Sequence, residues 1–246
     1  MSAGTVVTGR NAVARAVFVG LPERYDRLAY LLSFGQDRRW RRQVVEHVTA
    51  ADPDRVLDVA TGPAGVALAI AAAVPATVVG VDLNLPMLRQ GASNVRAQHR
   101  EQQVRLVAAR AEALPLAGSS FDAVSFSYLL RYVDDPVATI AEMARCLRPG
   151  GTLSGLEFYL PPRRSWRLAW TFYTSLVLPV LGWVGGGRAW WRVGRFLGPS
   201  IRDHYARFPL AAHVAAWEKA GLTDVGYRVM SVGGGLVMWG RKGPPL

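Results

Sequence analysis

A loop of small residues and an aspartate on the following predicted strand carry the clearest chemistry. The loop, residues 58–65 (DVATGPAG), joins a predicted strand directly to a predicted helix. Ligands of open α/β sheets lie beyond the carboxyl ends of the strands, and small residues there let them approach the backbone. Asp82 ends the next predicted strand, 24 residues after Asp58, where a carboxylate can accept hydrogen bonds from both ribose hydroxyls of an adenosine ligand. The pattern predicts an adenosine-containing ligand.

The glycine spacing bears on which adenosine ligand binds. NAD and S-adenosylmethionine both suit a ribose-binding carboxylate, and a tight turn without a ligand also suits the loop alone. However, Gly62 and Gly65 lack the three-glycine pattern that places a pyrophosphate on a helix N-terminus. The downstream loop 111–115 (AEALP) and the predicted strand 121–124 (FDAV) are more typical of a methyltransferase. We therefore expect S-adenosylmethionine as the cofactor.

The elements that must position this loop alternate regularly between strand and helix. Alternation of this kind predicts a mostly parallel sheet covered by helices on both faces. We expect a seven-stranded, Rossmann-like class I methyltransferase fold with a helical cap, in one domain over residues 23–246 that follows a partly flexible segment 1–22. The cap is expected at about 160–208. Predicted strands are 55–59, 76–81, 103–107, 121–126, 152–158, 224–230 and 236–239, and predicted helices are 64–73, 85–100, 136–147 and 211–220, with two helical pieces over 23–50.

Composition narrows the class of protein further. The formal charge of +11 is carried mainly by arginine, since only two of the 29 basic residues are lysine. Such a surplus favours anionic surfaces, of which we expect a membrane rather than nucleic acid, although codon bias gives the same pattern. The single cysteine, Cys146, falls on the apolar side of a predicted helix, which fits a buried thiol in a reducing cytoplasm. The four histidines show no metal-ligand spacing, so no metal site is expected.

From Tyr25 to Gly240 the sequence resembles the C-methyltransferases of ubiquinone and menaquinone biosynthesis, of the demethylmenaquinone methyltransferase type. The likeness rests on blocks spread along the chain, of which the first, the fourth and the cap residues are the most specific. They are Tyr25-Asp26 with Ser33-Phe34-Gly35 and Trp40-Arg41-Arg42; Val56-Leu57-Asp58; residues 111–116; residues 130–135 (LRYVDD); residues 147–151 (LRPGG) with Leu156-Glu157-Phe158; and Phe172-Tyr173 with Leu178-Pro179.

This resemblance implies methyl transfer to a ring carbon of a reduced, prenylated quinone. It implies that Asp82 holds the ribose, that Gly62 and its neighbours accommodate the methionine end, that Ala111 presents a backbone group to adenine, and that Ser127 lines the cofactor floor. The complete set expected to bind the cofactor is Asp58, Ala60, Thr61, Gly62, Asp82, Leu83, Met87, Arg110, Ala111 and Ser127. Asp58 has a second interpretation, in which it only ties the loop together.

Three residues are candidates for catalysis. Arg131 stays protonated, so it cannot be a simple base, but it can stabilise a phenolate or orient a water. The alternative to a catalytic role is that Arg131 forms an ion pair with Asp134 or Asp135. Tyr25 belongs to the opening block of the resemblance, and His204 is a further candidate proton acceptor, since it lies in the connection expected to face the substrate. Glu157 is expected to pair with an arginine of the cap.

Several positions depart from the family pattern. Ala29 and Tyr132 stand where the family has asparagine, Arg110 stands where it has Asp or Asn, and Ala64 replaces a glycine of the first loop. Arginine cannot accept a hydrogen bond from the adenine amino group. These departures favour a changed acceptor over an inactive enzyme.

The cap contains the uncharged stretch 168–184, flanked by arginines on both sides. Its length is at the lower limit for a helix that spans a membrane. Because the strands that follow it must return to the sheet, we expect it instead to form a cap over a pocket for a lipophilic tail. Tryptophans interleaved with arginines suit a lipid headgroup region, and an ordinary helical core is the alternative. We expect a cytoplasmic protein at the inner face of the membrane that binds anionic liposomes.

Three functions are consistent with the sequence. The first is a quinol C-methyltransferase with a lipophilic small-molecule acceptor. The second is a methyltransferase of the same fold acting on an aromatic or polyketide natural product, and the third is a non-catalytic methyltransferase-like binding protein. The oligomeric state stays open, with a homodimer as one alternative.

Overall fold

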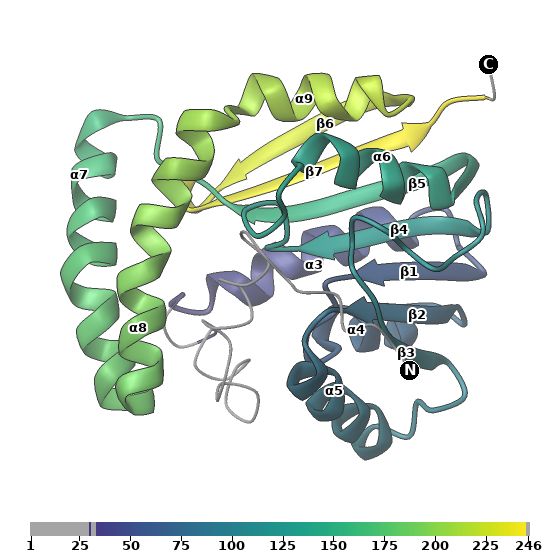
Figure 1. Cartoon of the computed structure of the whole chain (residues 1–246), viewed down its shortest axis with the longest axis horizontal. Coiled ribbons are helices and arrows are strands. Elements are labelled where there is room, and N and C mark those ends of the chain that lie inside the picture. The colour runs from purple at the N-terminus through teal and green to yellow at the C-terminus, as the bar shows by residue number, and fades with distance from the viewer. Residues whose placement is uncertain (1–29, 31–32, 245–246) are drawn as a thin grey trace, which may run out of the picture.

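The computed structural model describes residues 30, 33–244, and its centre is a seven-stranded sheet in the order β3-β2-β1-β4-β5-β7-β6 (Figure 1). β7 runs antiparallel to its neighbours β5 and β6, and the other pairs are parallel. The strands are β1 (Arg55–Val59), β2 (Thr77–Asp82), β3 (Val104–Ala108), β4 (Phe121–Ser127), β5 (Leu147–Phe158), β6 (Leu222–Met230) and β7 (Gly235–Lys242). The expected fold class is confirmed.

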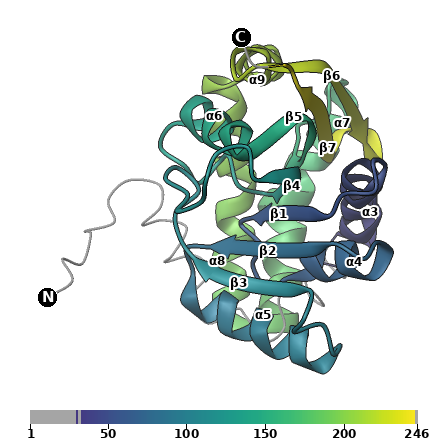
Figure 2. The same cartoon turned by 90° about the vertical axis from the view of Figure 1, so that its right-hand side faces the viewer.

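Helices cover both faces of the sheet, which agrees with the continuous burial of side chains on both faces of β1 and β4. On one face α3 (Gln36–Thr49), α4 (Gly65–Ala73) and α5 (Leu85–Ala97) enclose a core that contains Val44 and Ile70 (Figure 2). On the other face α6 (Pro136–Cys146) and α9 (Leu210–Lys219) enclose a second core around Met143 and Trp217. Cys146 is buried in this second core, as expected.

Most predicted elements agree with the structure within three residues at their ends. The main difference is at the start of the fifth strand, which we predicted at residue 152 and which instead begins at Leu147, with a register shift against β4. The last two strands, both predicted, form an antiparallel hairpin with a short 3-10 turn, η3 (Ser231–Gly233), between them. The first helical piece expected over 23–50 lies almost wholly outside the described residues.

A helical hairpin stands beyond the carboxyl ends of the parallel strands (Figure 1). It consists of α7 (Arg164–Phe172), the π turn η2 (Tyr173–Val177) and α8 (Leu178–Arg207). Gly187 has φ 67° and ψ −156°, a conformation that reverses the chain within α8. We call residues 164–186 the first arm and residues 188–207 the second arm. The arms pack closely through glycine, since a Cβ on Gly194 would lie 2.7 Å from the Cα of Pro179.

Candidate active site

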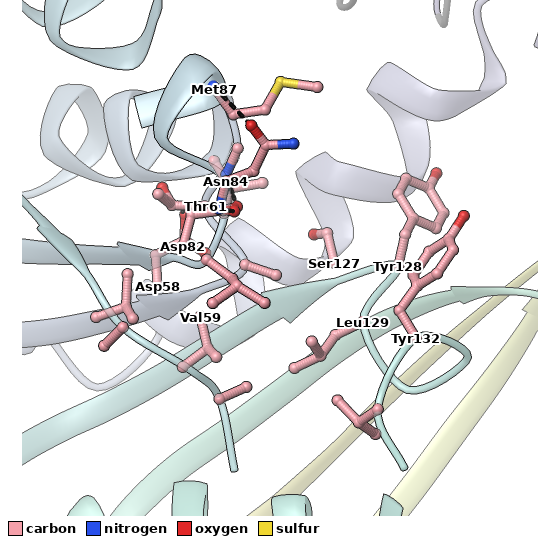
Figure 3. A pocket seen from close by; sticks show the side chains of 18 of the residues that line it. Asp58, Val59, Thr61, Asp82, Asn84, Met87, Ser127, Tyr128, Leu129 and Tyr132 are labelled. Atoms are coloured by element: carbon pink, nitrogen blue, oxygen red, sulfur yellow. Dashed lines mark hydrogen bonds between the residues drawn. The ribbon is translucent and has the colours of Figure 1, made fainter. Parts of the chain in front are cut away.

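A cleft of about 990 Å³, including the space at its mouth, lies at the carboxyl ends of β1, β2 and β4 (Figure 3). The loop after β1 forms one wall and has an unusual backbone, because Ala60, Gly62 and Ala64 all have positive φ values, of 57°, 55° and 66°. Left-handed backbone costs an alanine about 1–2 kcal/mol, so such a loop needs support from its surroundings.

Asp58 supplies that support from beneath the loop. Its carboxylate accepts hydrogen bonds of 2.7 Å each from the hydroxyls of Thr61 and Ser125. Burial raises the pKa of Asp58 to about 6, although these two hydrogen bonds oppose the rise. Asp58 borders the cleft, but its bonded partners show that it ties the loop to β4, which was the second interpretation of this residue.

Asp82 lies where the ends of β1 and β2 meet the loop (Figure 3). Its Oδ2 accepts a hydrogen bond of 2.8 Å from the amide of Gly62, and its Oδ1 accepts one of 2.8 Å from the amide of Asn84. Burial raises the pKa of Asp82, and these backbone amides oppose the rise. Each carboxylate oxygen can accept a further hydrogen bond from a ligand. Asn84 in turn caps α5 by accepting from the amide of Met87.

The cleft has the features that an adenosine ligand with a methionine end requires. The buried hydroxyl of Ser127 borders the cleft and has no hydrogen-bond partner among the described residues. A Cβ on Gly62 would meet nothing within 4 Å, so the backbone there is open to a ligand. Apolar side chains complete the walls. Of the residues expected to bind the cofactor, Asp58, Ala60, Thr61, Gly62, Asp82, Leu83, Met87, Ala111 and Ser127 line the cleft.

Arg110 is the member of that set that does not line the cleft. Its guanidinium Nη2 lies 3.6 Å from a carboxylate oxygen of Glu112. The adjacent residues Ala109, Ala111 and Glu112 do line the cleft. The side chain that departs from the family pattern is therefore not among those that face the expected position of the ligand.

A second and larger cavity, of about 1600 Å³ including its opening, lies between the sheet edge and the helical hairpin. Aromatic and aliphatic side chains from α3, the strand ends and both arms form most of its wall. Among the described residues that line it, Arg131 is the only basic side chain and Asp37 the only acidic one. The aromatic lining residues are Phe34, Trp40, Tyr128, Tyr132, Phe158, Trp166, Trp170, Tyr173, Trp190 and Phe196.

Arg131 is held by the sheet and by the hairpin together. Its Nε lies 3.5 Å from Oε2 of Glu157, and its Nη1 donates a 3.2 Å hydrogen bond to the hydroxyl of Ser200 in the second arm. The other carboxylate oxygen of Glu157 accepts from the amide of Leu130 at 2.7 Å. The partner of Glu157 is thus Arg131 and not an arginine of the cap, so that expectation is wrong. Asp135 instead caps α6, by accepting from the first amides of that helix.

Tyr128 and Tyr132 line both the cleft and the cavity, so they mark the place where the two spaces meet (Figure 3). The hydroxyl of Tyr128 donates a 2.6 Å hydrogen bond to Oδ1 of Asp37. The guanidinium of Arg41 contacts the same carboxylate, with its Nε 2.9 Å from Oδ2. Burial raises the pKa of Tyr132, and the guanidinium of Arg131 lies 4.8 Å from the centre of its ring.

Comparison with known proteins decides the family. The model of the ubiE/COQ5 methyltransferase family matches residues 6–242. The chain belongs to this family. It is 34% identical to a ubiquinone/menaquinone biosynthesis C-methyltransferase of Geobacter sulfurreducens, over 96% of this chain and 91% of the relative. It is also 38% identical to a demethylmenaquinone methyltransferase of Thermus thermophilus, over 88% of this chain and 96% of the relative.

Solved structures of low sequence identity confirm the fold. A putative methyltransferase of Bacillus halodurans has a TM-score of 0.53 and 18% identity, and the match covers 83% of this chain and 99% of that one. The phosphoethanolamine N-methyltransferase 2 of Haemonchus contortus, solved with S-adenosyl-L-methionine, has a TM-score of 0.64 and 13% identity, over 98% of this chain and 62% of that one. Membership of the ubiE/COQ5 family, rather than these structures, makes the protein an S-adenosylmethionine-dependent methyltransferase, and the non-catalytic alternative is not favoured.

The structure also places the remaining candidate residues of this methyltransferase. His204 does not line the cavity, although we expected it to face the substrate. Its Nε2 lies 3.1 Å from Nε2 of His213, and burial lowers the pKa of His204 to about 3 and that of His213 to about 4. Both rings are therefore neutral at pH 7, and they are buried where the second arm of the hairpin meets α9. Tyr25 and Ala29 lie outside the described residues.

Sequence reasoning missed several residues of the methyltransferase site. Asn84 precedes a Leu-Pro helix start, so an N-cap signal was present in the sequence. Asp37 and Tyr128 are 91 residues apart, and no local pattern indicates that they are hydrogen-bonded. Trp40, quoted only for the family likeness, lines the cavity and donates from its indole to the hydroxyl of Ser231 at 2.9 Å.

Proposed function

We propose that this methyltransferase transfers the methyl group of S-adenosylmethionine to a ring carbon of a prenylated quinol of the demethylmenaquinol type. The cofactor binds in the cleft and the quinol ring in the cavity. The observation that carries the proposal is the cavity itself, whose aromatic and aliphatic wall holds one arginine and one aspartate beside its junction with the cleft. The names of the curated relatives support the same acceptor class.

Cleft residues hold the donor. When bound, S-adenosylmethionine supplies a methyl group that is already activated on a positively charged sulfur. The carboxylate of Asp82 accepts from the ribose hydroxyls, and the hydroxyl of Ser127 provides a hydrogen bond to the ligand. The open backbone at Gly62 leaves room for the methionine end. These roles use the remaining hydrogen-bonding capacity of each group.

Arg131 activates the acceptor by electrostatics. A ring carbon becomes strongly nucleophilic when the neighbouring hydroxyl is deprotonated, and phenols titrate near pH 10. A neighbouring cation favours the ionised form of an acid, so Arg131 lowers the pKa of a phenol beside it, and the carboxylate of Glu157 offsets part of this effect. The guanidinium itself keeps its proton and releases none. Its contacts with Glu157 and Ser200 fix its position in the cavity wall.

We assign the proton acceptor to Asp37, through the hydroxyl of Tyr128 or directly. Asp37 is the only carboxylate among the described residues that line the cavity, and it already accepts from Tyr128 at the junction. In the net reaction the ring exchanges a C–H bond for a C–CH₃ bond, the sulfonium becomes a neutral thioether, and one proton is released. The wall of apolar side chains keeps bulk water away from the reacting carbon.

The test is methylation of a short-chain demethylmenaquinol with isotopically labelled S-adenosylmethionine, with the methyl position located by mass spectrometry. We expect Asp37→Asn to lower kcat at pH 7 by about 10²- to 10⁴-fold, the range of a general base, and to recover activity as the pH rises. Asp203→Asn, on the exposed side of the second arm, is the control and should leave kcat unchanged.

Two outcomes would contradict parts of this proposal. Turnover of a tailless aromatic natural product without turnover of the quinol would reject the acceptor and favour the second candidate function. An Asp37→Asn variant with the kcat and pH profile of the parent would remove Asp37 from the proton path.

A further inference from the structure

The first arm of the hairpin is apolar on both of its sides. Its inner side, which includes Trp170, Tyr173 and Leu178, lines the cavity. Its outer side carries a stripe of five apolar side chains at intervals of four residues, between 41% and 74% exposed. We define this outer stripe as Leu168, Phe172, Leu176, Val180 and Val184. A helix that is apolar all round is stable when its whole surface is buried, but the described residues cover only one side of the arm.

The outer stripe is long and continuous. Sixteen residues separate its ends, which corresponds to about 24 Å of helix. Trp183 and Trp191 are also exposed near the tip of the hairpin and extend the apolar surface there. Contiguous apolar surfaces of this kind on soluble proteins mark sites that bind a membrane or another molecule.

Charge identifies the partner. Residues 163–207 contain eight arginines and a single acidic residue, Asp203. Three exposed arginines lie at the start of the first arm and three more lie just after the chain reversal at Gly187, so both ends of the outer stripe carry positive charge. They are Arg163, Arg164, Arg167, Arg188, Arg192 and Arg195. An apolar stripe with cations at its ends matches the acyl boundary and anionic headgroups of a bilayer.

We propose that the outer stripe lies in the interfacial layer of an anionic lipid bilayer, with the hairpin parallel to the membrane surface. The span Arg164–Arg207 is long and apolar enough to cross a membrane by length and composition. However, Gly187 reverses the chain halfway, and a crossing would carry the three arginines of the tip through the hydrocarbon core. Tryptophans near the tip also favour the interface over the core.

This arrangement joins the membrane to the cavity through one helix. The outer side of the first arm faces lipid, while its inner side faces the acceptor, so a prenyl tail passes from one apolar environment to another. The inference deepens the proposed function by stating where the acceptor enters. It does not depend on the identity of the acceptor, because membrane binding is measured without one.

The first experiment is flotation of the full chain with vesicles of phosphatidylcholine and phosphatidylglycerol at 7:3, and with phosphatidylcholine alone. We expect binding to the anionic vesicles that weakens as salt rises, and at least tenfold weaker binding for Leu176→Gln/Val184→Gln. The matched control is Leu85→Gln/Val229→Gln, two exposed apolar residues on α5 and β6, which should bind like the parent. Equal binding by both double variants would overturn the proposal.

A second experiment measures directly how deeply the outer stripe enters the bilayer. Cys146 is the only cysteine and is buried, so Val184→Cys provides an accessible thiol for an environment-sensitive fluorophore. We expect a blue shift on anionic vesicles and quenching by spin-labelled acyl chains, and neither for labelled Leu85→Cys. No shift at position 184 would overturn the proposal. So would a dimer in sedimentation velocity that the stripe variant converts to monomer, since the stripe would then be covered by a second copy.

The failure of this inference can be told apart from the failure of the proposed function. The stripe variant should methylate a tailless quinol analogue in detergent-free buffer at the rate of the parent. Loss of that activity in the stripe variant, with a normal unfolding curve, would count against the inference, since the outer side would then serve the site itself. Absence of quinol turnover in the parent would count against the proposed function alone.

Discussion

Replacing Arg131 with methionine is expected to destabilise the fold, because the arginine is the partner of a buried carboxylate. Arg131 Nε lies 3.5 Å from Glu157 Oε2, and both side chains are almost fully buried. Removing one member of a buried ion pair typically costs about 3–5 kcal/mol, since the other charge is left uncompensated. We expect a loss of that order in the free energy of unfolding at pH 8.

The loss should depend on pH. Burial raises the pKa of Glu157, and the charge of Arg131 is the largest influence that opposes this rise. Without Arg131 the pKa of Glu157 rises further, so the folded variant holds a proton that the unfolded chain has released. A group whose pKa is raised by folding loses its stabilising contribution as the pH increases. The difference in the free energy of unfolding between the parent and Arg131→Met should therefore become smaller as the pH falls from 8 to 5.5.

Urea unfolding at pH 5.5, 7 and 8 measures this for the parent, Arg131→Met, Glu157→Gln and the double variant. The double variant should be more stable than Arg131→Met at pH 8, because glutamine leaves no buried charge. Arg131→Met should also lower kcat by about 10²- to 10³-fold if the guanidinium stabilises a phenolate, the range found for a single oxyanion donor. Two results together would refute this expectation. The stability losses of Arg131→Met and Glu157→Gln would add up, within about 0.5 kcal/mol, to the loss of the double variant, and the stability deficit of Arg131→Met would be the same at pH 8 and pH 5.5.

Further variants test the cleft and the cores. Ser127→Ala should weaken S-adenosylmethionine binding about fivefold in calorimetry, as expected for one hydrogen bond, and should leave the unfolding curve unchanged; equal affinity would exclude the hydroxyl from the donor site. His204 and His213 stay neutral in the fold down to about pH 3 and 4, whereas unfolded histidines gain a proton near 6.5, so the parent should lose stability as the pH falls from 6.5 toward 4. His204→Phe/His213→Leu should flatten that slope in urea unfolding, and an unchanged slope would contradict the assignment. Gly155→Ala should cost at least about 2 kcal/mol, because the added Cβ would lie 2.1 Å from a phenylalanine ring, while Gly118→Ala, with its nearest neighbour at 3.4 Å, should cost little.

The fold was largely predictable because its signals are local. The loop after β1, the aspartate that ends β2 and the alternation of strands with helices are all visible in short windows of sequence. Asp82 accepts from the amide of Asn84, two residues away, and from the amide of Gly62, in the loop after the neighbouring strand β1, which the strand-helix-strand pattern brings to the same end of the sheet. The cleft in which we expect S-adenosylmethionine to bind is built mainly from segments that local patterns identify.

The cavity was less predictable than the cleft, because the residues that contact one another in its wall are distant in the sequence. The sequence offered an ion pair with Asp134 or Asp135 as the alternative role of Arg131, but no local pattern indicated its contact with Glu157, which is 26 residues away on β5. The uncharged stretch 168–184 indicated a cap, but the chain reversal at Gly187 decides which of its residues face the cavity and which face outward. A three-glycine tip and a π turn in the first arm do not follow a simple helical period.

The residues that depart from the family pattern differ in whether they line the cleft or the cavity. Arg110 pairs with Glu112 and is not among the residues that line the cleft, and Ala64 adopts the left-handed backbone that a glycine would adopt at a lower cost. Neither Arg110 nor Ala64 is among the described residues that line the cleft. Tyr132, in contrast, lies at the junction and in the cavity wall, with its ring against Arg131. Of the departures that lie within the described residues, Tyr132 is therefore the one that changes the wall of both spaces, and under the proposed function it would contact the acceptor ring.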